Sequence, residues 1–96
     1  MDIKDIAANA QVAATLLKQL SNEHRLLILC LLMENELSVG QIHKQTSLSQ
    51  SALSQHLASL RVAGLVKTRR ESQTIYYSLD GEESIAIIEV LHKIYC

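Results

Sequence analysis

Two short helices separated by a turn are indicated by residues 38–64, which read SVGQIHKQTSLSQSALSQHLASLRVAG. Ser38 and Gln41 have the spacing of a capping box, in which the serine bonds a backbone amide ahead of it and the glutamine reaches back. Ser49 follows a polar turn and is a preferred residue type for capping a second helix. Gly64 suits the left-handed backbone conformation that ends many helices. The stretch therefore predicts a helix-turn-helix motif.

The second helix of this motif has an apolar side and a polar side. The inward side carries Leu53, Leu57 and Leu60. The outward side carries Gln50, Ser51, Ser54, Gln55, Ala58 and Arg61. Glutamine can bond adenine bidentately in the major groove, and serine can bond bases or phosphates, so this side is a candidate DNA reader. His56 lies at the edge of the inward side, where a hydrogen-bonded packing role competes with DNA contact. For a polar helix taken by itself, the alternative is that the serine and glutamine side chains only make a surface helix soluble.

The hydrophobic pattern changes from helical to alternating after Gly64. Residues 65–70 and 74–79 are β-prone, and the polar residues 71–73 join them as the tip of a hairpin. This hairpin carries three basic residues, namely Lys67, Arg69 and Arg70. Such a hairpin is expected to act as a wing that contacts the DNA backbone or the minor groove.

Three further helices flank this unit. Residues 3–20 place apolar side chains at alternating helical spacings, which gives a narrow apolar seam. Ser21 is the expected cap of a second helix, whose residues 26–33 are apolar all round and should be buried. Asp80 is the expected cap of a last helix with a wide apolar side. The predicted order is α-α-α-α-β-β-α, a mainly helical winged helix-turn-helix fold in one domain over residues 1–96.

The apolar surface of the first and last helices exceeds what one small core can cover. On the last helix it comprises Ile85, Ile88, Leu91 and Ile94. A single recognition helix also reads too few base pairs for useful specificity, and two-fold symmetry doubles the site. We therefore expect a homodimer.

Charge is unevenly distributed along a chain whose net charge is −1. Residues 1–37 carry three basic and five acidic groups, residues 38–79 five basic and one acidic, and residues 80–96 one basic and four acidic. The positive middle indicates a nucleic-acid surface, although a solvated charged face explains the charge alone equally well. The start of the chain lacks signal-peptide features, and the apolar run 26–33 is too short for a bilayer. We expect a cytoplasmic protein without a membrane partner.

The chain resembles ArsR/SmtB-type repressors along nearly its whole length. The similarity is strongest at residues 48–57 (LSQSALSQHL), with Leu60-Arg61 and residues 64–66 (GLV) following. Residues 20–26 (LSNEHRL) and 74–77 (TIYY) extend it. The resemblance implies a homodimer through the first and last helices that binds double-stranded DNA at an imperfectly palindromic operator.

Metal sensing, which is common in this family, is not expected here. Where one type of member has a Cys-x-Cys pair, this chain has Ser38 and Gly40, which supply no thiolate. On the last helix only Glu89 and His92 are suggestive, and two ligands do not close a zinc site. We interpret them as a surface pair. Nothing resembles a catalytic set, so neither an enzyme nor a cofactor is expected.

Cys30 and Cys96 are the two cysteines. Taken alone, Cys30 on an apolar helix is a small packing side chain more often than a reactive thiol. Residues 28–32 (ILCLL) and 91–96 (LHKIYC), however, resemble the HlyU/BigR/SqrR/YgaV subgroup. This resemblance implies that the two thiols respond to persulfides or polysulfides by forming a di- or polysulfide link, which releases the repressor from DNA.

Four alternatives stay open at this point. The dithiol could be a general oxidant switch, or the protein could compete with another silencer at a virulence or transport promoter. It could also be a thiol-based sulfur carrier, or a dimeric interaction module without DNA binding. The polar recognition face and the basic hairpin favour DNA binding over the last two.

Overall fold

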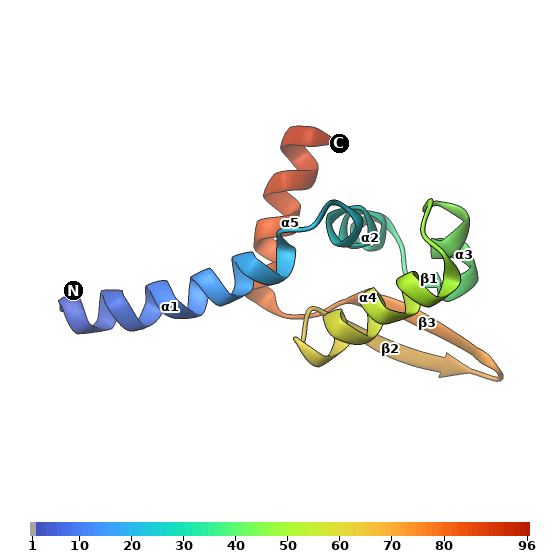
Figure 1. Cartoon of the computed structure of the whole chain (residues 1–96), viewed down its shortest axis with the longest axis horizontal. Coiled ribbons are helices and arrows are strands. Elements are labelled where there is room, and N and C mark those ends of the chain that lie inside the picture. The colour runs from blue at the N-terminus through green and yellow to red at the C-terminus, as the bar shows by residue number, and fades with distance from the viewer. Residues whose placement is uncertain (1) are drawn as a thin grey trace.

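The computed structural model describes residues 2–96, which form five α-helices and a three-stranded antiparallel sheet (Figure 1). The elements in chain order are α1 Ile3–Leu20, α2 Glu23–Glu34, β1 Leu37–Ser38, α3 Val39–Lys44, α4 Gln50–Val62, β2 Val66–Glu71, β3 Thr74–Leu79 and α5 Glu82–Tyr95. The mainly helical architecture with α3 and α4 as consecutive short helices and β2–β3 as a hairpin confirms the predicted fold class.

Local hydrogen bonds set the ends of the helix-turn-helix as expected. Ser38 and Gln41 form the capping box of α3, with both hydrogen bonds present. The Ser49 hydroxyl accepts from a backbone amide in the first turn of α4. Gly64 follows the end of α4 with φ at +77°, the left-handed conformation that glycine adopts without a steric cost.

Two predicted caps are wrong by one residue. Asn22, rather than Ser21, caps α2, because its side-chain oxygen accepts from two backbone amides of the first turn at 2.9 and 3.1 Å. Ser21 instead ends α1. Gly81 takes the cap position of α5 without a side-chain bond, and Asp80 accepts from the Gly81 amide at 3.0 Å. The local amide geometry decides between neighbouring polar residues.

The sheet contains a strand that the sequence did not reveal. β1 pairs with β3 through Leu37↔Tyr77 and Ser38↔Tyr76, so the strand order is β1-β3-β2. Two residues are too few for an alternating pattern, and their pairing depends on a strand some forty residues later. The hairpin turns at Ser72, whose φ is +59°. β1 ties the middle of β3 to the start of α3.

The core lies where α2 packs against α5 and the sheet, under α3 and α4. Its buried side chains are Leu20, Ile28, Leu29, Leu32, Ile42, Leu53, Leu57, Leu60, Leu65, Val66 and Ile88. The prediction that residues 26–33 are buried all round is wrong, since Leu27 is 39% exposed. In the single chain, α2 is buried where it meets other elements and is exposed on the side that carries Leu27.

α1 projects away from the rest of the molecule, which is 49 Å along its longest axis (Figure 1). Its last residue, Leu20, joins the core, whereas Ile3 is 78% exposed and Leu17 is 55% exposed. At the other end of the chain, Ile94 on α5 is 64% exposed. None of the helices in the described part of the chain combines the length and apolarity that crossing a membrane requires.

Candidate nucleic-acid interface and thiol pocket

The polar side of α4 faces solvent. Gln50, Ser51, Ser54 and Gln55 are all exposed, while the leucines on the opposite side are buried. The geometry follows from the helical period, because Leu53 and its partners hold the other side against the core. The exposed amides and hydroxyls are therefore free to meet base edges, and the start of α4 directs its backbone amides the same way.

A hollow of about 510 Å³ lies beside this polar side, between α4 and the sheet. Its lining consists of Val39, Ser54, Leu57, Ala58, Arg61, Val62 and Tyr77. Arg61 is exposed at this edge and adds a positive charge to it. The hairpin also packs against α4 through β2, so the polar side of α4 and the hairpin belong to one connected unit.

The three basic residues of the hairpin differ in how free they are. Lys67 and Arg70 are exposed, and Arg70 donates to the Ser72 carbonyl at 3.2 Å. Arg69 is instead held by two carboxylates, donating to both oxygens of Glu36 at 3.1 Å and to Glu71 at 2.8 Å.

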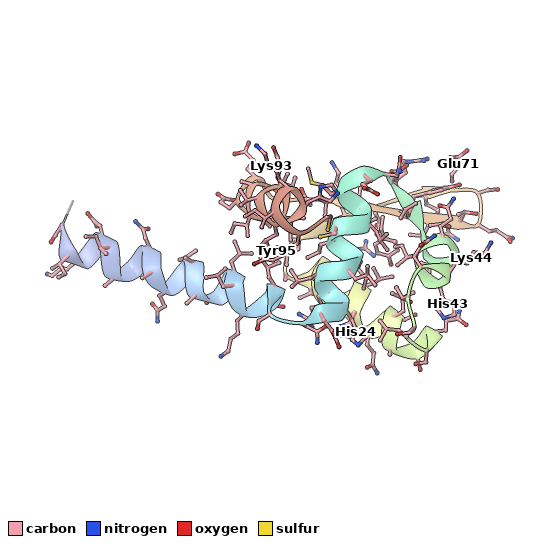
Figure 2. The ribbon with its side chains drawn as sticks, turned by 90° about the horizontal axis from the view of Figure 1, so that it is seen from above. His24, His43, Lys44, Glu71, Lys93 and Tyr95 are labelled. Carbon is pink, nitrogen blue, oxygen red and sulfur yellow. The ribbon has the colours of Figure 1, made fainter. Side chains whose placement is uncertain are left out.

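The Arg69 guanidinium also lies over the Tyr76 ring, with 4.6 Å between its central carbon and the ring centroid. Its hydrogen bonds lower the pKa of the Glu36 carboxyl. Figure 2 shows Glu71 at this hairpin. The sequence pointed to Arg69 as a phosphate contact and missed its main partner, because Glu36 lies 33 residues earlier.

His56 is half-buried on the side of α4 that meets α2. Its Nδ1 atom accepts from Arg25 Nε at 3.2 Å, and its ring lies 6.1 Å from the His24 ring. Burial lowers the pKa of His56, and the charge of Arg25 and the neighbouring His24 lower it further. These contacts give His56 the hydrogen-bonded packing role that the sequence offered as the alternative to DNA contact.

The structure brings the two cysteines to one pocket of about 310 Å³. The pocket lies between α2 and the end of α5 and is lined by Glu23, Leu26, Leu27, Cys30, Leu91, Tyr95 and Cys96. Tyr95, one of the lining residues, is labelled in Figure 2. Both thiols are free, with Cys30 half-buried and Cys96 exposed.

The two thiols influence each other. Burial, a hydrogen bond with the Cys96 thiol, and the negative charges of Cys96 and Glu34 raise the pKa of Cys30 to about 11. At neutral pH Cys30 is therefore a protonated thiol, and a weak nucleophile. The pocket that holds the two thiols is lined mainly by apolar side-chain surface.

The predicted pairing of Glu89 with His92 is wrong. His92 Nε2 lies 3.2 Å from Glu34 Oε1, which bridges α5 to the end of α2, and Glu89 is exposed. Within residues 2–96, three or more metal-ligating side chains gather nowhere in the molecule. This contact joins α5 to the end of α2.

Comparisons with known proteins place these features in context. A sequence profile described as "Bacterial regulatory protein, arsR family" matches residues 22–68, from the cap of α2 into β2. A protein from Vibrio cholerae serotype O1, described as "Transcriptional activator HlyU", is 53% identical over 96 residues, covering all of this chain and 89% of that protein. The structure of reduced HlyU from Vibrio cholerae has a TM-score of 0.91 at 54% identity, covering 97% of this chain and 98% of that one.

Two other solved structures share the fold. The transcriptional repressor BigR from Xylella fastidiosa has a TM-score of 0.93 at 38% identity, covering 99% of this chain and 94% of that one. The homodimeric winged helix-turn-helix DNA-binding domain Mb0332 from Mycobacterium bovis has a TM-score of 0.77 at 32% identity, covering 98% and 86%.

Proposed function

Since this chain belongs to the ArsR family of bacterial regulatory proteins and is a DNA-binding transcriptional regulator, we propose that it acts as a homodimeric repressor. We further propose that it leaves its operator when Cys30 and Cys96 become linked by persulfide or polysulfide. The observation that carries the first part is the exposed polar side of α4 beside a basic hairpin. The observation that carries the second is the shared pocket of the two thiols.

For DNA recognition, α4 is the element we assign to the major groove. Gln50, Ser51, Ser54 and Gln55 supply base contacts, and Lys67 and Arg70 supply phosphate contacts from the hairpin. Arg69 contributes mainly by holding the hairpin to Glu36. A phosphate could still reach it, because the ion pair is exposed.

The dimer is supported by the helices that lack a partner within the chain. α1 projects from the body with Ile3, Ile6 and Leu17 exposed, and α5 exposes Val90 and Ile94. A second copy that packs its own α1 and α5 against them would bury these side chains. The resulting two-fold symmetry would place two α4 helices on successive turns of an imperfectly palindromic operator.

The unequal thiols suggest an order of reaction with a persulfide, RSSH. Cys96 is exposed and attacks first, at the outer sulfur, which forms Cys96–S–SH and releases RSH. Cys30 then attacks the sulfur atom that belongs to Cys96, which forms the disulfide and releases hydrogen sulfide. If a second RSSH first extends the chain to Cys96–S–S–SH with release of RSH, attack of Cys30 on the middle sulfur gives a trisulfide and hydrogen sulfide.

The test is a mobility-shift titration of the DNA upstream of the protein's own gene, with and without a persulfide donor. The Cys30→Ser variant should bind this DNA like the wild type but keep it when the donor is added. Intact mass of the treated wild type should show a linked product, with or without retained sulfur. Release of Cys30→Ser as readily as the wild type would refute the sensing role.

Two related functions differ in what they predict. A general oxidant switch would give the linked product with peroxide and without added sulfur, which mass spectrometry distinguishes. An activating role by competition with a silencer is favoured by the description of the Vibrio cholerae relative as an activator. Deleting the gene would then lower, rather than raise, the transcripts of its targets.

A further inference from the structure

Arg25, in the first turn of α2, joins three helices through one guanidinium. Its Nε atom donates to His56 Nδ1 at 3.2 Å, and its Nη2 atom donates to Ser59 Oγ at 2.9 Å, both on α4. Its Nη1 atom donates to the carbonyl and the side-chain oxygen of Gln19, at 3.3 and 2.7 Å, in the last turn of α1. All three nitrogen atoms of the guanidinium are thus bonded within the protein.

The partners of Arg25 lie on a different side of α4 from the candidate reader side. His56 and Ser59 are half-buried and three residues apart, so they face α2 together, whereas Gln50 and Gln55 face solvent. Arg25 is itself half-buried. Charge-assisted hydrogen bonds in a partly buried site are stronger and more directional than contacts at an open surface. The guanidinium is therefore placed to fix the position of α4 relative to α2 and α1.

We propose that Arg25 is a positioning residue for DNA recognition, which holds α4 in its DNA-reading orientation through His56 and Ser59 without touching DNA. The proposal rests on α4 being the recognition helix, and it does not depend on the thiol chemistry. It assigns His56 to this clamp instead of to base contact. It also links the helix that carries Cys30 and the projecting helix α1 to the helix that meets DNA.

The clamp has a consequence for pH. His56 accepts at Nδ1, so its doubly protonated form can no longer bond Arg25 and carries a like charge beside it. The charged or titratable groups around it are Arg25 and His24, and Glu23 lies 3.8 Å from His24. Because the pKa of His56 is lowered in the folded chain, its bond is present above the usual histidine range and is lost as pH falls through that lowered value.

The experiment compares three variants of the full chain, Arg25→Lys, His56→Asn and His24→Asn. Lysine keeps the charge of Arg25 but cannot bond three partners in a fork. Asparagine at position 56 keeps an acceptor close to the place of Nδ1 and does not titrate. His24→Asn is the matched control, since His24 makes no hydrogen bond to Arg25. Affinity is measured for operator and random duplexes over a salt series, and thermal unfolding is recorded for each variant.

For Arg25→Lys we expect the operator affinity to fall about tenfold or more, with little change on random duplex. The slope of log affinity against log salt should stay that of the wild type. An equal loss of affinity on operator and random duplex would mean that Arg25 supports DNA binding in general and not the reading orientation of α4, and the proposal would be overturned. Wild-type operator affinity in this variant would overturn it as well.

The pH profile separates positioning from mere stability. As pH falls from neutral through the lowered pKa of His56, the ratio of operator to random affinity should fall for the wild type and for His24→Asn, and stay flat for His56→Asn. An equal fall in His56→Asn refutes the clamp even if Arg25→Lys proves unstable. A Gln55→Ala variant that binds the operator like the wild type would instead contradict the assignment of α4 as the reader.

Discussion

Burial determines which of the two thiols reacts first with a donor. Cys30 lies on α2 with its thiol half-buried against Cys96, and its pKa of about 11 leaves about one molecule in a thousand as thiolate at pH 8. Cys96 is exposed at the end of α5. The exposed Cys96 is therefore suited to meet the donor first, and Cys30, which lies in the same pocket, reacts second with the modified Cys96.

Alkylation of the reduced protein should reveal this order. With iodoacetamide near neutral pH, Cys96 should be labelled well before Cys30. The Cys30 rate should rise about tenfold per pH unit up to about pH 11, since only the thiolate reacts. Peptide mapping by mass spectrometry at several pH values measures both rates. Faster labelling of Cys30 near neutral pH would contradict the proposed order.

A second prediction at the scale of single residues concerns the ion pairs of Arg69. Its charge is compensated by Glu36 and Glu71, so replacing Glu36 with glutamine should free it for a phosphate. We expect Glu36→Gln to bind both operator and random DNA a few times more tightly, with a salt slope steeper by up to about 0.9. Glu89→Gln, which removes an exposed carboxylate on α5, is the control. Equal behaviour of the two variants would show that Arg69 stays committed to the hairpin.

Among the elements, the junction between α4 and β2 depends on one backbone conformation. Gly64 has φ at +77°, and a Cβ atom added there would meet no atom within 4 Å. The cost of a substitution is therefore conformational and not steric. The junction fixes where the hairpin leaves the recognition helix, so strain there affects both halves of the candidate DNA surface.

Gly64→Ala should lower the free energy of unfolding by about 1 kcal/mol, because alanine in the left-handed region is strained by its own backbone. Gly40→Ala, within α3, is the matched control. The nearest atom to its added Cβ is the Ser38 hydroxyl oxygen at 4.0 Å, so we expect no loss of stability. Urea titration followed by circular dichroism measures both. Equal stabilities would show that this junction is not strained by alanine.

At the scale of the whole molecule, the projecting α1 supports the proposal of a partner copy. α1 extends the chain to 49 Å along its long axis, and its first turns meet no other element of the same chain (Figure 1). An isolated helix of this kind is marginal in water, because helices in proteins are stabilised mainly by packing of an apolar face. Association of two copies, as proposed above, would supply that packing.

Ile6→Glu should therefore yield a monomer that has lost operator binding, while the core stays folded. Ile6 is 48% exposed on the projecting part of α1, and Val62 is 91% exposed at the end of α4. Val62→Glu serves as the control for oligomeric state, which it should leave dimeric. Sedimentation velocity measures the mass of each variant. A dimeric Ile6→Glu protein would contradict dimerisation through α1.

Much of the local structure of this protein could be predicted from its sequence alone. The capping box of Ser38 with Gln41, the cap at Ser49 and the turn at Gly64 involve groups within a few residues of one another, so their spacing alone reveals them. The same holds for the two faces of α4, because the helical period separates the inward leucines from the polar side chains. The helices, the hairpin and the candidate reader side were all predictable in this way.

Long-range contacts were decided only by the tertiary structure. Arg25 meets His56 across 31 residues, Arg69 meets Glu36 across 33, and Cys30 shares a pocket with Cys96. No periodicity records such pairs, because they arise from how helices and strands pack after they form. Packing also raised the pKa of Cys30 and lowered the pKa of His56, since burial and neighbouring charges depend on groups far away in the chain.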